Sequence, residues 1–162
     1  MIVRGFGPVA APDARILILG SMPGVASLEA GEYYAHPRNA FWLIMGALFG
    51  AGPNLPYAER VARLKAERVA VWDVLQACER EGSLDSNIRS ELPNDLAAFF
   101  AAHPAIRRIG LNGAKAAATF RKYAAHSLPA NAEVHVLAST SPAHAARSFE
   151  VKCDLWRAAL LP

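Results

Sequence analysis

The chain has 162 residues, of which 53% are hydrophobic and 19% are charged, and its net charge is +3. That length fits one domain with a full apolar core, and the composition excludes a disordered chain. No run approaches the roughly 18 apolar residues of a membrane span, and the first residues lack the apolar region of a secretory signal, so we expect a cytoplasmic protein without a membrane partner.

The distribution of charge and the two cysteines bear on which partners and cofactors the protein binds. Residues 103–162 carry 8 Lys or Arg and 3 Asp or Glu, a net of +5, whereas residues 1–102 have a net of −2. A basic half is compatible with a phosphate-rich partner, although ordinary sign fluctuation on a solvated surface explains it equally well. Cys78 and Cys153 lie far apart without metal-ligand spacing, which predicts reduced thiols and neither a metal nor an iron–sulfur cofactor.

The predicted strands and helices alternate four times. The first strand is continuously apolar, as in a parallel sheet that is buried on both faces. Strands are expected at Arg15–Leu19, Val69–Trp72, Ile106–Leu111 and Val134–Leu137. Helices are expected at Ala40–Phe49, Pro56–Glu67, from Pro93 or Asn94 onward, Ala114–Ala125 and most of Ala143–Leu160. This alternation predicts an α/β fold, with a central four-stranded parallel sheet between helices on both faces, as a single domain over residues 1–162.

The loops that follow these strands should meet at one edge of the sheet, because crossovers between parallel strands are right-handed. Ligands of open α/β sheets bind at the carboxyl ends of the strands. The first of these loops, Gly20–Trp42, is so long that it is expected to have a function. The others are Asp73–Glu91, with its polar part from Cys78 onward, Asn112–Gly113 and Ser139–Pro142. We therefore expect the functional site at this edge.

The common enzyme motifs do not occur in these loops. There is no Gly-x-x-x-x-Gly-Lys-Ser/Thr phosphate loop, no Gly-x-Gly-x-x-Gly dinucleotide motif and no Gly-x-Ser-x-Gly nucleophile elbow. The 5 histidines form no helical pair suited to zinc. The loops offer aromatic rings, prolines, hydroxyls and an amide, which suit a flat neutral ligand such as a flipped nucleobase.

Three segments resemble one known family. They are GSMPG at residues 20–24, YYAHPRNAFW at residues 33–42 and STSPAHA at residues 139–145. Together they resemble the two motifs of the uracil-DNA glycosylase superfamily, most closely its hypoxanthine (deoxyinosine) DNA glycosylase branch, and CEREGSLDS at residues 78–86 adds to the match. The resemblance implies that family's three-layer α/β/α sandwich along essentially the whole chain.

The resemblance also implies roles for residues of the first motif. Met22 stands where the mismatch-specific branch has an asparagine that positions the attacking water, so Asn39 is expected to take that catalytic role, as in the hypoxanthine branch. Tyr34 is expected to stack on the extruded base. Gly20, Ser21 and Met22 are expected to line the pocket and offer backbone N–H groups to the base.

Further positions follow from the second motif and from the end of the second predicted strand. Asp73, at the end of that strand, is a candidate to contact the base. The second motif is expected to enter the minor groove and support the flipped nucleotide; its DNA-binding residues are Ser139, Ser141, Pro142 and His144. Because no lysine falls in the two motifs, a Schiff-base lyase step is not expected.

Simpler structural roles remain open for several of these residues. Asn39 precedes a predicted helix and could serve as its N-cap, a role compatible with catalysis. Asp73 could cap the turn that follows it, and Asn112 could cap the next helix. Ser83 and Asp85 fit an ordinary polar surface loop. Lys115, Arg121 and Arg147 are equally compatible with phosphate contacts and with a solvated face.

These inferences converge on a monofunctional DNA glycosylase acting in base excision repair. We expect it to hydrolyse the N-glycosidic bond of deaminated nucleotides in single- or double-stranded DNA, hypoxanthine first and then uracil or xanthine, as a monomer without metal. A uracil or thymine glycosylase acting on G:U and G:T mismatches is the enzymatic alternative. Alternatives of other classes are a non-catalytic binder of damaged DNA and a nucleoside-binding α/β protein.

Overall fold

A computed structural model describes all 162 residues. Its centre is a four-stranded parallel sheet in the order β3-β2-β6-β7. The strands are β2 (Ile16–Gly20), β3 (Val69–Asp73), β6 (Arg108–Asn112) and β7 (Glu133–Leu137). All four predicted strands are therefore present, and each differs from its expected range by at most two residues at an end.

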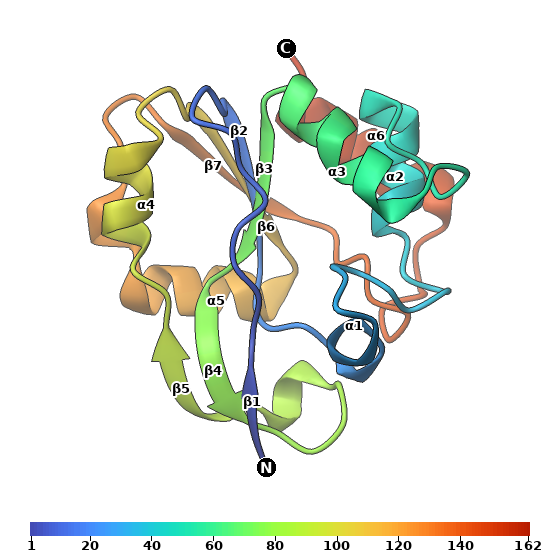
Figure 1. Ribbon diagram of the computed structural model, residues 1–162, viewed down its shortest axis with the longest axis vertical. Coiled ribbons are helices and arrows are strands. Elements are labelled where there is room, and N and C mark those ends of the chain that lie inside the picture. Colours follow the sequence, from blue (N-terminus) through green and yellow to red (C-terminus); the bar gives the residue numbers. More distant parts are fainter.

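Helices cover both faces of this sheet, as predicted (Figure 1). One face carries α4 (Leu96–Ala102) and α5 (Ala114–Tyr123). The other carries α2 (Phe41–Phe49), α3 (Tyr57–Ala66) and α6 (Phe149–Leu160). The α/β/α sandwich expected from the sequence is confirmed.

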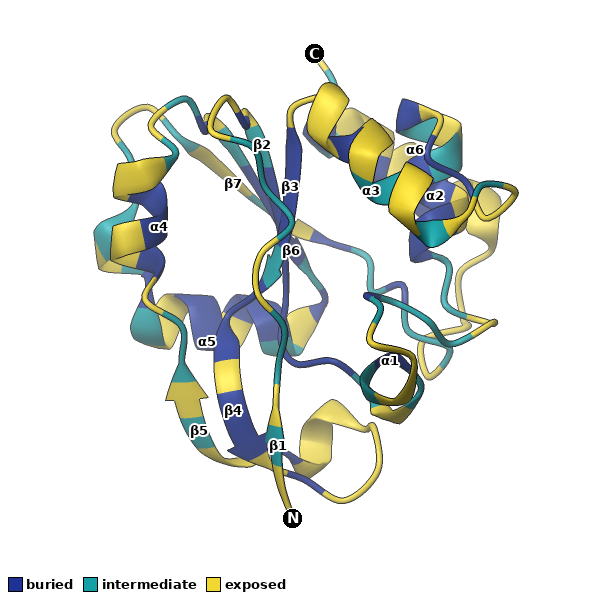
Figure 2. Ribbon diagram, in the orientation of Figure 1, coloured by how far each residue is buried: buried dark blue, intermediate teal, exposed yellow.

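Strand β2 divides the core between the two faces. Leu17 and Leu19 belong to the cluster under α4 and α5, whereas Ile18 belongs to the cluster under α2, α3 and α6. All three side chains are 0% exposed, because side chains of a strand alternate between the two faces of a sheet that is covered on both. Figure 2 shows this dark central band between the mostly exposed outer faces of the helices.

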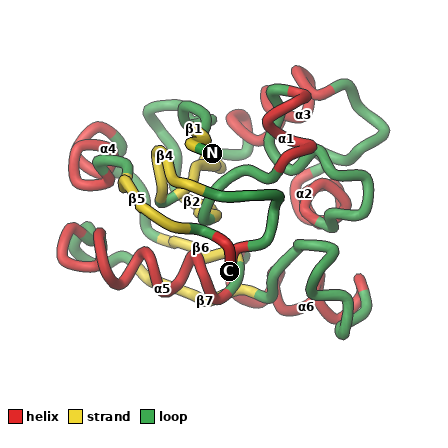
Figure 3. The backbone as a smooth tube through the Cα atoms, turned by 90° about the horizontal axis from the view of Figure 1, so that it is seen from below, coloured by secondary structure: helices red, strands yellow, loops and turns green.

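A second, antiparallel sheet in the order β1-β4-β5 was not predicted. It consists of β1 (Ile2–Arg4), β4 (Leu75–Glu79) and β5 (Arg89–Pro93), with the short 3-10 helix η1 (Asp85–Asn87) between the last two (Figure 3). The expectation of one long loop over Asp73–Glu91 was therefore wrong. Strand β1 has 3 residues, and β5 is mostly polar and exposed. Neither segment has the apolar pattern from which a strand can be predicted, and each is a strand only through its pairing with β4.

Several helix boundaries also differ from expectation. The long first loop contains a six-residue helix, α1 (Val25–Ala30), which ends at Gly31 with φ of 68°. Helix α4 begins after Asp95, whose carboxylate accepts from the N–H of Ala98, and not after Asn94. Helix α6 begins at Phe149, because Ser148 caps it through a hydrogen bond from Val151 N–H.

The two cysteines are buried with free thiols. Cys78 packs with Met22, Leu75 and Ile88 in a small apolar cluster that joins the second sheet to the first loop. No helix of the chain has both the length and the apolar character needed to cross a membrane.

Candidate functional site

The carboxyl ends of all four parallel strands meet at one edge of the sheet. Gly20 lies opposite Asp73 in the register of β2 and β3, and Asn112 lies opposite Leu137 in that of β6 and β7. The loops after these strands therefore converge as expected, and they bring together polar side chains that are distant in the sequence.

Asn112 is the centre of this convergence. Its Nδ2 donates to the hydroxyl of Tyr34 at 3.3 Å and to Oγ1 of Thr140 at 3.0 Å, and its Oδ1 accepts from the N–H of Thr140 at 3.1 Å. The N-cap of α5 is Gly113, so the interpretation of Asn112 as a helix cap was wrong. One amide instead joins the first motif to the second.

Asn39 lies immediately beside this network. Its Oδ1 accepts from the N–H of Phe41, the first residue of α2, at 2.9 Å, while its Nδ2 has no hydrogen-bond partner in the chain. The next residue, Ala40, donates its N–H to the carbonyl of the buried Thr140 at 3.0 Å. The N-cap of α2 is Ala40, without a side-chain cap bond, so the interpretation of Asn39 as the N-cap was wrong. Its contact with Phe41 N–H leaves one lone pair and both amide hydrogens of Asn39 available to a ligand or water.

Tyr34 presents a neutral phenol to the same region. Its ring stacks on that of Phe41 with centroids 4.0 Å apart, so one face is already covered. Its backbone has φ of 54°, an uncommon conformation for a bulky residue that is often found at functional sites. Burial, followed by the nearby Asp73 carboxylate, raises the pKa of Tyr34 far above its ordinary value, so the hydroxyl remains protonated.

Asp73 is the most perturbed acid of the protein. It is 4% exposed, and its Oδ2 has no hydrogen-bond partner. Burial, with a smaller contribution from Asp85, raises the pKa of Asp73 to about 7, and Arg80 opposes this rise. Neither carboxylate oxygen accepts a bond from the following turn, so the capping interpretation was wrong.

Gly20 explains how the carboxyl and the phenol share one space. A Cβ at this position would lie 2.5 Å from Oδ1 of Asp73 and 2.8 Å from the hydroxyl oxygen of Tyr34. Both contacts are too short for any side chain, so only glycine allows these two groups to approach the backbone of β2. The carboxyl and phenol groups therefore point toward the first motif.

The second sheet holds the first motif in place. Ser21 donates its hydroxyl to Oδ1 of Asp85 at 2.6 Å, and Val25 donates its N–H to Oγ of Ser83 at 2.8 Å. Arg80, which is 3% exposed, donates from Nη2 to the carbonyl of Pro23. Ser83 and Asp85 therefore bind the first motif, which the interpretation of both as residues of an ordinary polar surface loop did not include.

Met22 has a mainly structural position. It is 7% exposed and its side chain lies in the apolar cluster with Leu75, Cys78 and Ile88. Its side chain has no oxygen or nitrogen with which to orient a water. A role of Met22 as a pocket wall remains a prediction.

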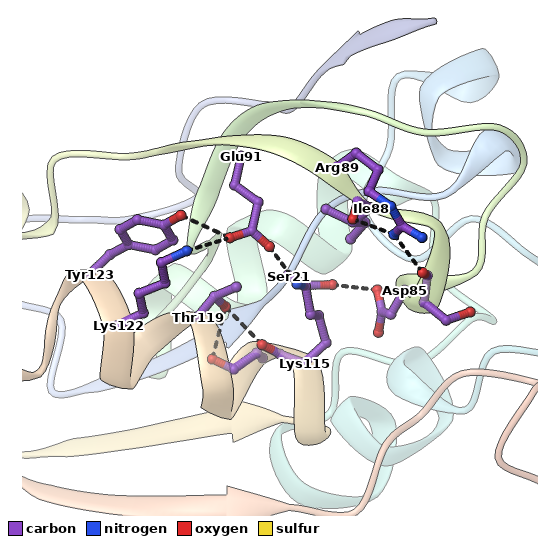
Figure 4. A network of polar contacts seen from close by, with 11 residues as sticks. Ser21, Asp85, Ile88, Arg89, Glu91, Lys115, Thr119, Lys122 and Tyr123 are labelled. Atoms are coloured by element: carbon purple, nitrogen blue, oxygen red, sulfur yellow. Dashed lines mark hydrogen bonds and ion pairs between the residues drawn. The ribbon is translucent and has the colours of Figure 1, made fainter.

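A polar groove of about 320 Å³ opens beside the first motif. One side of the groove is formed by η1 and the start of β5, and the other side by the N-terminus of α5 (Figure 4). Its lining includes two predicted DNA-binding residues and several basic side chains: Ser139, His144, Arg89 and Lys115, with Asp85, Ser86, Ile88, Gly113 and Ala114. The other two predicted DNA-binding residues lie in the adjoining turn, where Ser141 Oγ, one residue before Pro142, accepts from the N–H of Ala143 at 3.2 Å.

Glu91 fixes one wall of this groove to α5. Its carboxylate pairs with Lys115 and accepts from the hydroxyl of Tyr123 at 2.8 Å, and Lys122 lies 3.8 Å away (Figure 4). Burial alone would raise the pKa of Glu91, but the bonds from Lys115 and Tyr123 outweigh it and hold the pKa below its usual value. Lys115 is thus partly committed to this pair.

Sequence reasoning did not assign Arg80 or Thr140 to the site. Arg80 sits in a polar run with no feature that predicts burial, although it falls within the CEREGSLDS segment. Thr140 lies between two serines of the second motif that were singled out, and it is the most buried of the three. Their importance comes from contacts with residues far away in the chain.

The fold and the arrangement of this edge define an α/β/α protein in which two motifs meet at the carboxyl ends of the parallel strands, joined through Asn112. A sequence model of the Uracil DNA glycosylase superfamily matches residues 6–160, and the chain belongs to that superfamily and is a DNA N-glycosylase.

Individual relatives agree with this assignment. A hypoxanthine DNA glycosylase of Methanosarcina acetivorans is 40% identical over 117 residues, which cover 72% of this chain and 74% of that protein. A hypoxanthine DNA glycosylase of Methanosarcina barkeri is 36% identical over 113 residues, covering 69% and 72%. A solution NMR structure of a candidate uracil DNA glycosylase from M. acetivorans superposes with a TM-score of 0.80 at 34% identity, covering 95% of both chains.

Proposed function

We propose that this protein removes hypoxanthine from deoxyinosine in DNA, with uracil and xanthine as weaker substrates, and leaves an abasic site. The single observation that carries the choice of hypoxanthine over adenine is the unpartnered carboxylate oxygen of Asp73 beside Gly20 and Tyr34. Hypoxanthine has a ring N–H next to a carbonyl, and an ionised carboxylate can accept a hydrogen bond from that N–H. Adenine has a ring nitrogen without hydrogen at this position and cannot donate such a bond. The two similar proteins named hypoxanthine DNA glycosylase support the same substrate.

Asn39 orients the water that attacks C1′ of the sugar. Water oxygen bonds to C1′, the bond from C1′ to the base nitrogen breaks, and its electron pair leaves with the base. The proton that the water loses passes to solvent. The enzyme contributes positioning and electrostatic stabilisation of the departing base, and no step draws on a metal or on a covalent enzyme intermediate.

The base enters between the first motif and Tyr34. Tyr34 stacks on the base through the face that Phe41 leaves open, and backbone groups of Gly20, Ser21 and Met22 line the pocket. Flipping places the Watson–Crick edge of the base against Asp73.

The groove and the second motif hold the DNA around the flipped nucleotide. Ser139, Ser141, Pro142 and His144 support the sugar and the neighbouring phosphates, and Arg89 adds a basic contact at the groove wall. The protein acts as a cytoplasmic monomer on single- or double-stranded DNA.

Release of free base from a panel of duplexes containing hypoxanthine, uracil or xanthine tests the substrate order. Hypoxanthine should be released fastest, and faster release of uracil would support the mismatch-specific alternative.

Asn39→Ala should lower the single-turnover rate by about 10²-fold or more while retaining most DNA affinity. The matched control is Asn54→Ala, an exposed amide between α2 and α3. A wild-type protein that binds these duplexes but never releases a base would be a damage binder.

A further inference from the structure

The only buried side-chain atoms without a hydrogen-bond partner belong to two residues. They are Oδ2 of Asp73 and Nε and Nη1 of Arg80. Both residues flank the first motif, since Asp73 lies beside Gly20 and Arg80 binds the carbonyl of Pro23. Buried polar groups are nearly always paired, so a cluster of such exceptions needs a functional explanation.

Arg80 is fixed in place by its surroundings. It follows β4, its backbone N–H donates to the carbonyl of Met1 at 3.0 Å, and its guanidinium is held at Pro23. It forms no salt bridge with any carboxylate within 4.0 Å, although burying an uncompensated cation is strongly unfavourable. Its compensation must therefore come from carboxylates at somewhat longer range.

Asp73 is the buried carboxylate that feels this charge. Asp85 on η1 acts on it with the same sign and raises its pKa, and Arg80 is the cation that lowers it. The hydroxyl of Tyr34 lies beside Asp73 at Gly20, whereas the hydroxyl of Tyr33 donates to the carbonyl of Gly7. Burial, followed by the Asp73 carboxylate, raises the pKa of both tyrosines, which stay neutral. Burial is the largest influence on the ionisation of Asp73, and the two charged groups that add to it or oppose it, Asp85 and Arg80, both come from the segment between β4 and β5.

We propose that Arg80 is a positioning residue of the base pocket, which holds the Pro23 carbonyl and supplies the positive charge that lets Asp73 accept a hydrogen bond as a carboxylate. An ionised Asp73, which only accepts hydrogen bonds, then favours a base with a ring N–H beside a carbonyl over adenine, whose ring nitrogen at that position carries no hydrogen. This inference rests on the proposed function, since it takes Asp73 as the group that contacts the base.

A titration that needs no substrate tests the coupling directly. The Asp73 side-chain carboxyl ¹³C resonance is followed against pH in the wild type, Arg80→Gln, Arg80→Lys and Asp85→Asn. We expect the midpoint to rise in Arg80→Gln, to stay near the wild-type value in Arg80→Lys and to fall in Asp85→Asn. An unchanged midpoint in Arg80→Gln would overturn the proposal, whatever the midpoint of Asp85→Asn. Asp85 is exposed, and its variant separately measures how far Asp73 responds to a nearby charge.

Single-turnover release of hypoxanthine from an inosine duplex gives the functional readout. The acidic limb of the pH–rate profile should move to higher pH in Arg80→Gln and to lower pH in Asp85→Asn, by the same amounts as the resonance midpoints. An Arg80→Gln protein that is slower at every pH with an unmoved limb would reduce Arg80 to a structural support and overturn the proposal. Moving midpoints in a wild type that releases no base would instead refute the proposed function, while the coupling of Arg80 to Asp73 would stand.

Discussion

At the scale of single residues, Asp73 combines burial, an unpartnered oxygen and a pKa raised to about 7. A buried carboxylate in this state destabilises the folded chain, because ionisation is easier in the unfolded one. Residues of this kind concentrate at functional sites, where the fold tolerates them in exchange for a ready acceptor. The same buried carboxyl that reduces stability can therefore read the base.

Asp73→Asn should stabilise the protein, and more at pH 8 than at pH 5. The folded protein keeps a proton on Asp73 that the unfolded chain releases from pH 3.8 upward, so this group's contribution falls as pH rises from about 4 to about 7 and is then constant. The difference between the two pKa values corresponds to an upper limit on the order of 4 kcal/mol. Thermal unfolding of both proteins at the two pH values checks this; an equal gain at both would contradict the raised pKa.

Gly20→Ala should lower the single-turnover rate of base release, although the substitution adds only one methyl group. The added methyl group would displace Oδ1 of Asp73 and the hydroxyl of Tyr34, with a stability loss of about 1–3 kcal/mol. Gly7→Ala is the matched control, because a Cβ there meets nothing within 4 Å. Single-turnover rates and melting temperatures of the pair provide the measurement, and equal behaviour of the two variants would argue against close packing at Gly20.

At the scale of elements, two long-range connections hold the site together. Asn112 at the end of β6 joins the first loop to the loop between β7 and α6, and the second sheet clamps the first motif from the other side. The bonds of Asn112 and the bond from Arg80 to Pro23 involve buried or half-buried groups, whereas Asp85, which accepts from Ser21, is exposed. Loss of either should therefore disturb the site before it unfolds the central sheet.

Asn112→Ala should lower the free energy of unfolding by about 1–3 kcal/mol, because it leaves the buried Thr140 N–H without an acceptor. It should also weaken DNA binding through the second motif. Asn87→Ala is the control, since that amide makes only one exposed bond, to the carbonyl of Glu81 at 3.4 Å. Denaturant unfolding of both variants decides between a structural bridge and a surface amide.

Glu91→Gln should destabilise the joint between β5 and α5, and the loss should be larger at pH 7 than at pH 3. The pKa of Glu91 is held below its usual value, so its contribution is present above the unfolded pKa and disappears as pH falls through the folded pKa. Melting temperatures at the two pH values test this. A deficit that is the same at both would show that the charge of Glu91 does not matter.

At the scale of the whole molecule, both motifs and the groove with its basic residues Arg89 and Lys115 lie at the carboxyl edge of the sheet. The C-terminal part of the chain, which has a net charge of +5, supplies Lys115 and the second motif to this edge. DNA affinity that depends on phosphate contacts falls steeply with salt, because counterions are released on binding.

Arg89→Ala should weaken DNA binding similarly for all sequences and reduce the slope of log affinity against log salt concentration by about 1. Arg63→Ala, an exposed arginine on α3, is the control and should leave the slope unchanged. Fluorescence anisotropy over a salt series measures both. An unchanged slope in Arg89→Ala would show that Arg89 does not contact the DNA phosphates.

The parallel sheet, its covering helices and the edge at which the loops meet could all be predicted from the amino-acid sequence, because apolar periodicity and strand–helix alternation are local patterns. The sequence also pointed to Asn39 and Tyr34 through the first motif, and to Asp73 through its place at the end of a predicted strand. Only the tertiary structure decided which groups meet: Arg80 binds the Pro23 carbonyl across 57 residues of chain, and Ser21 binds Asp85 across 64. Such pairs have no local signature, since burial of Arg80 and the ionisation of Asp73 depend on neighbours that only the folded chain brings within reach.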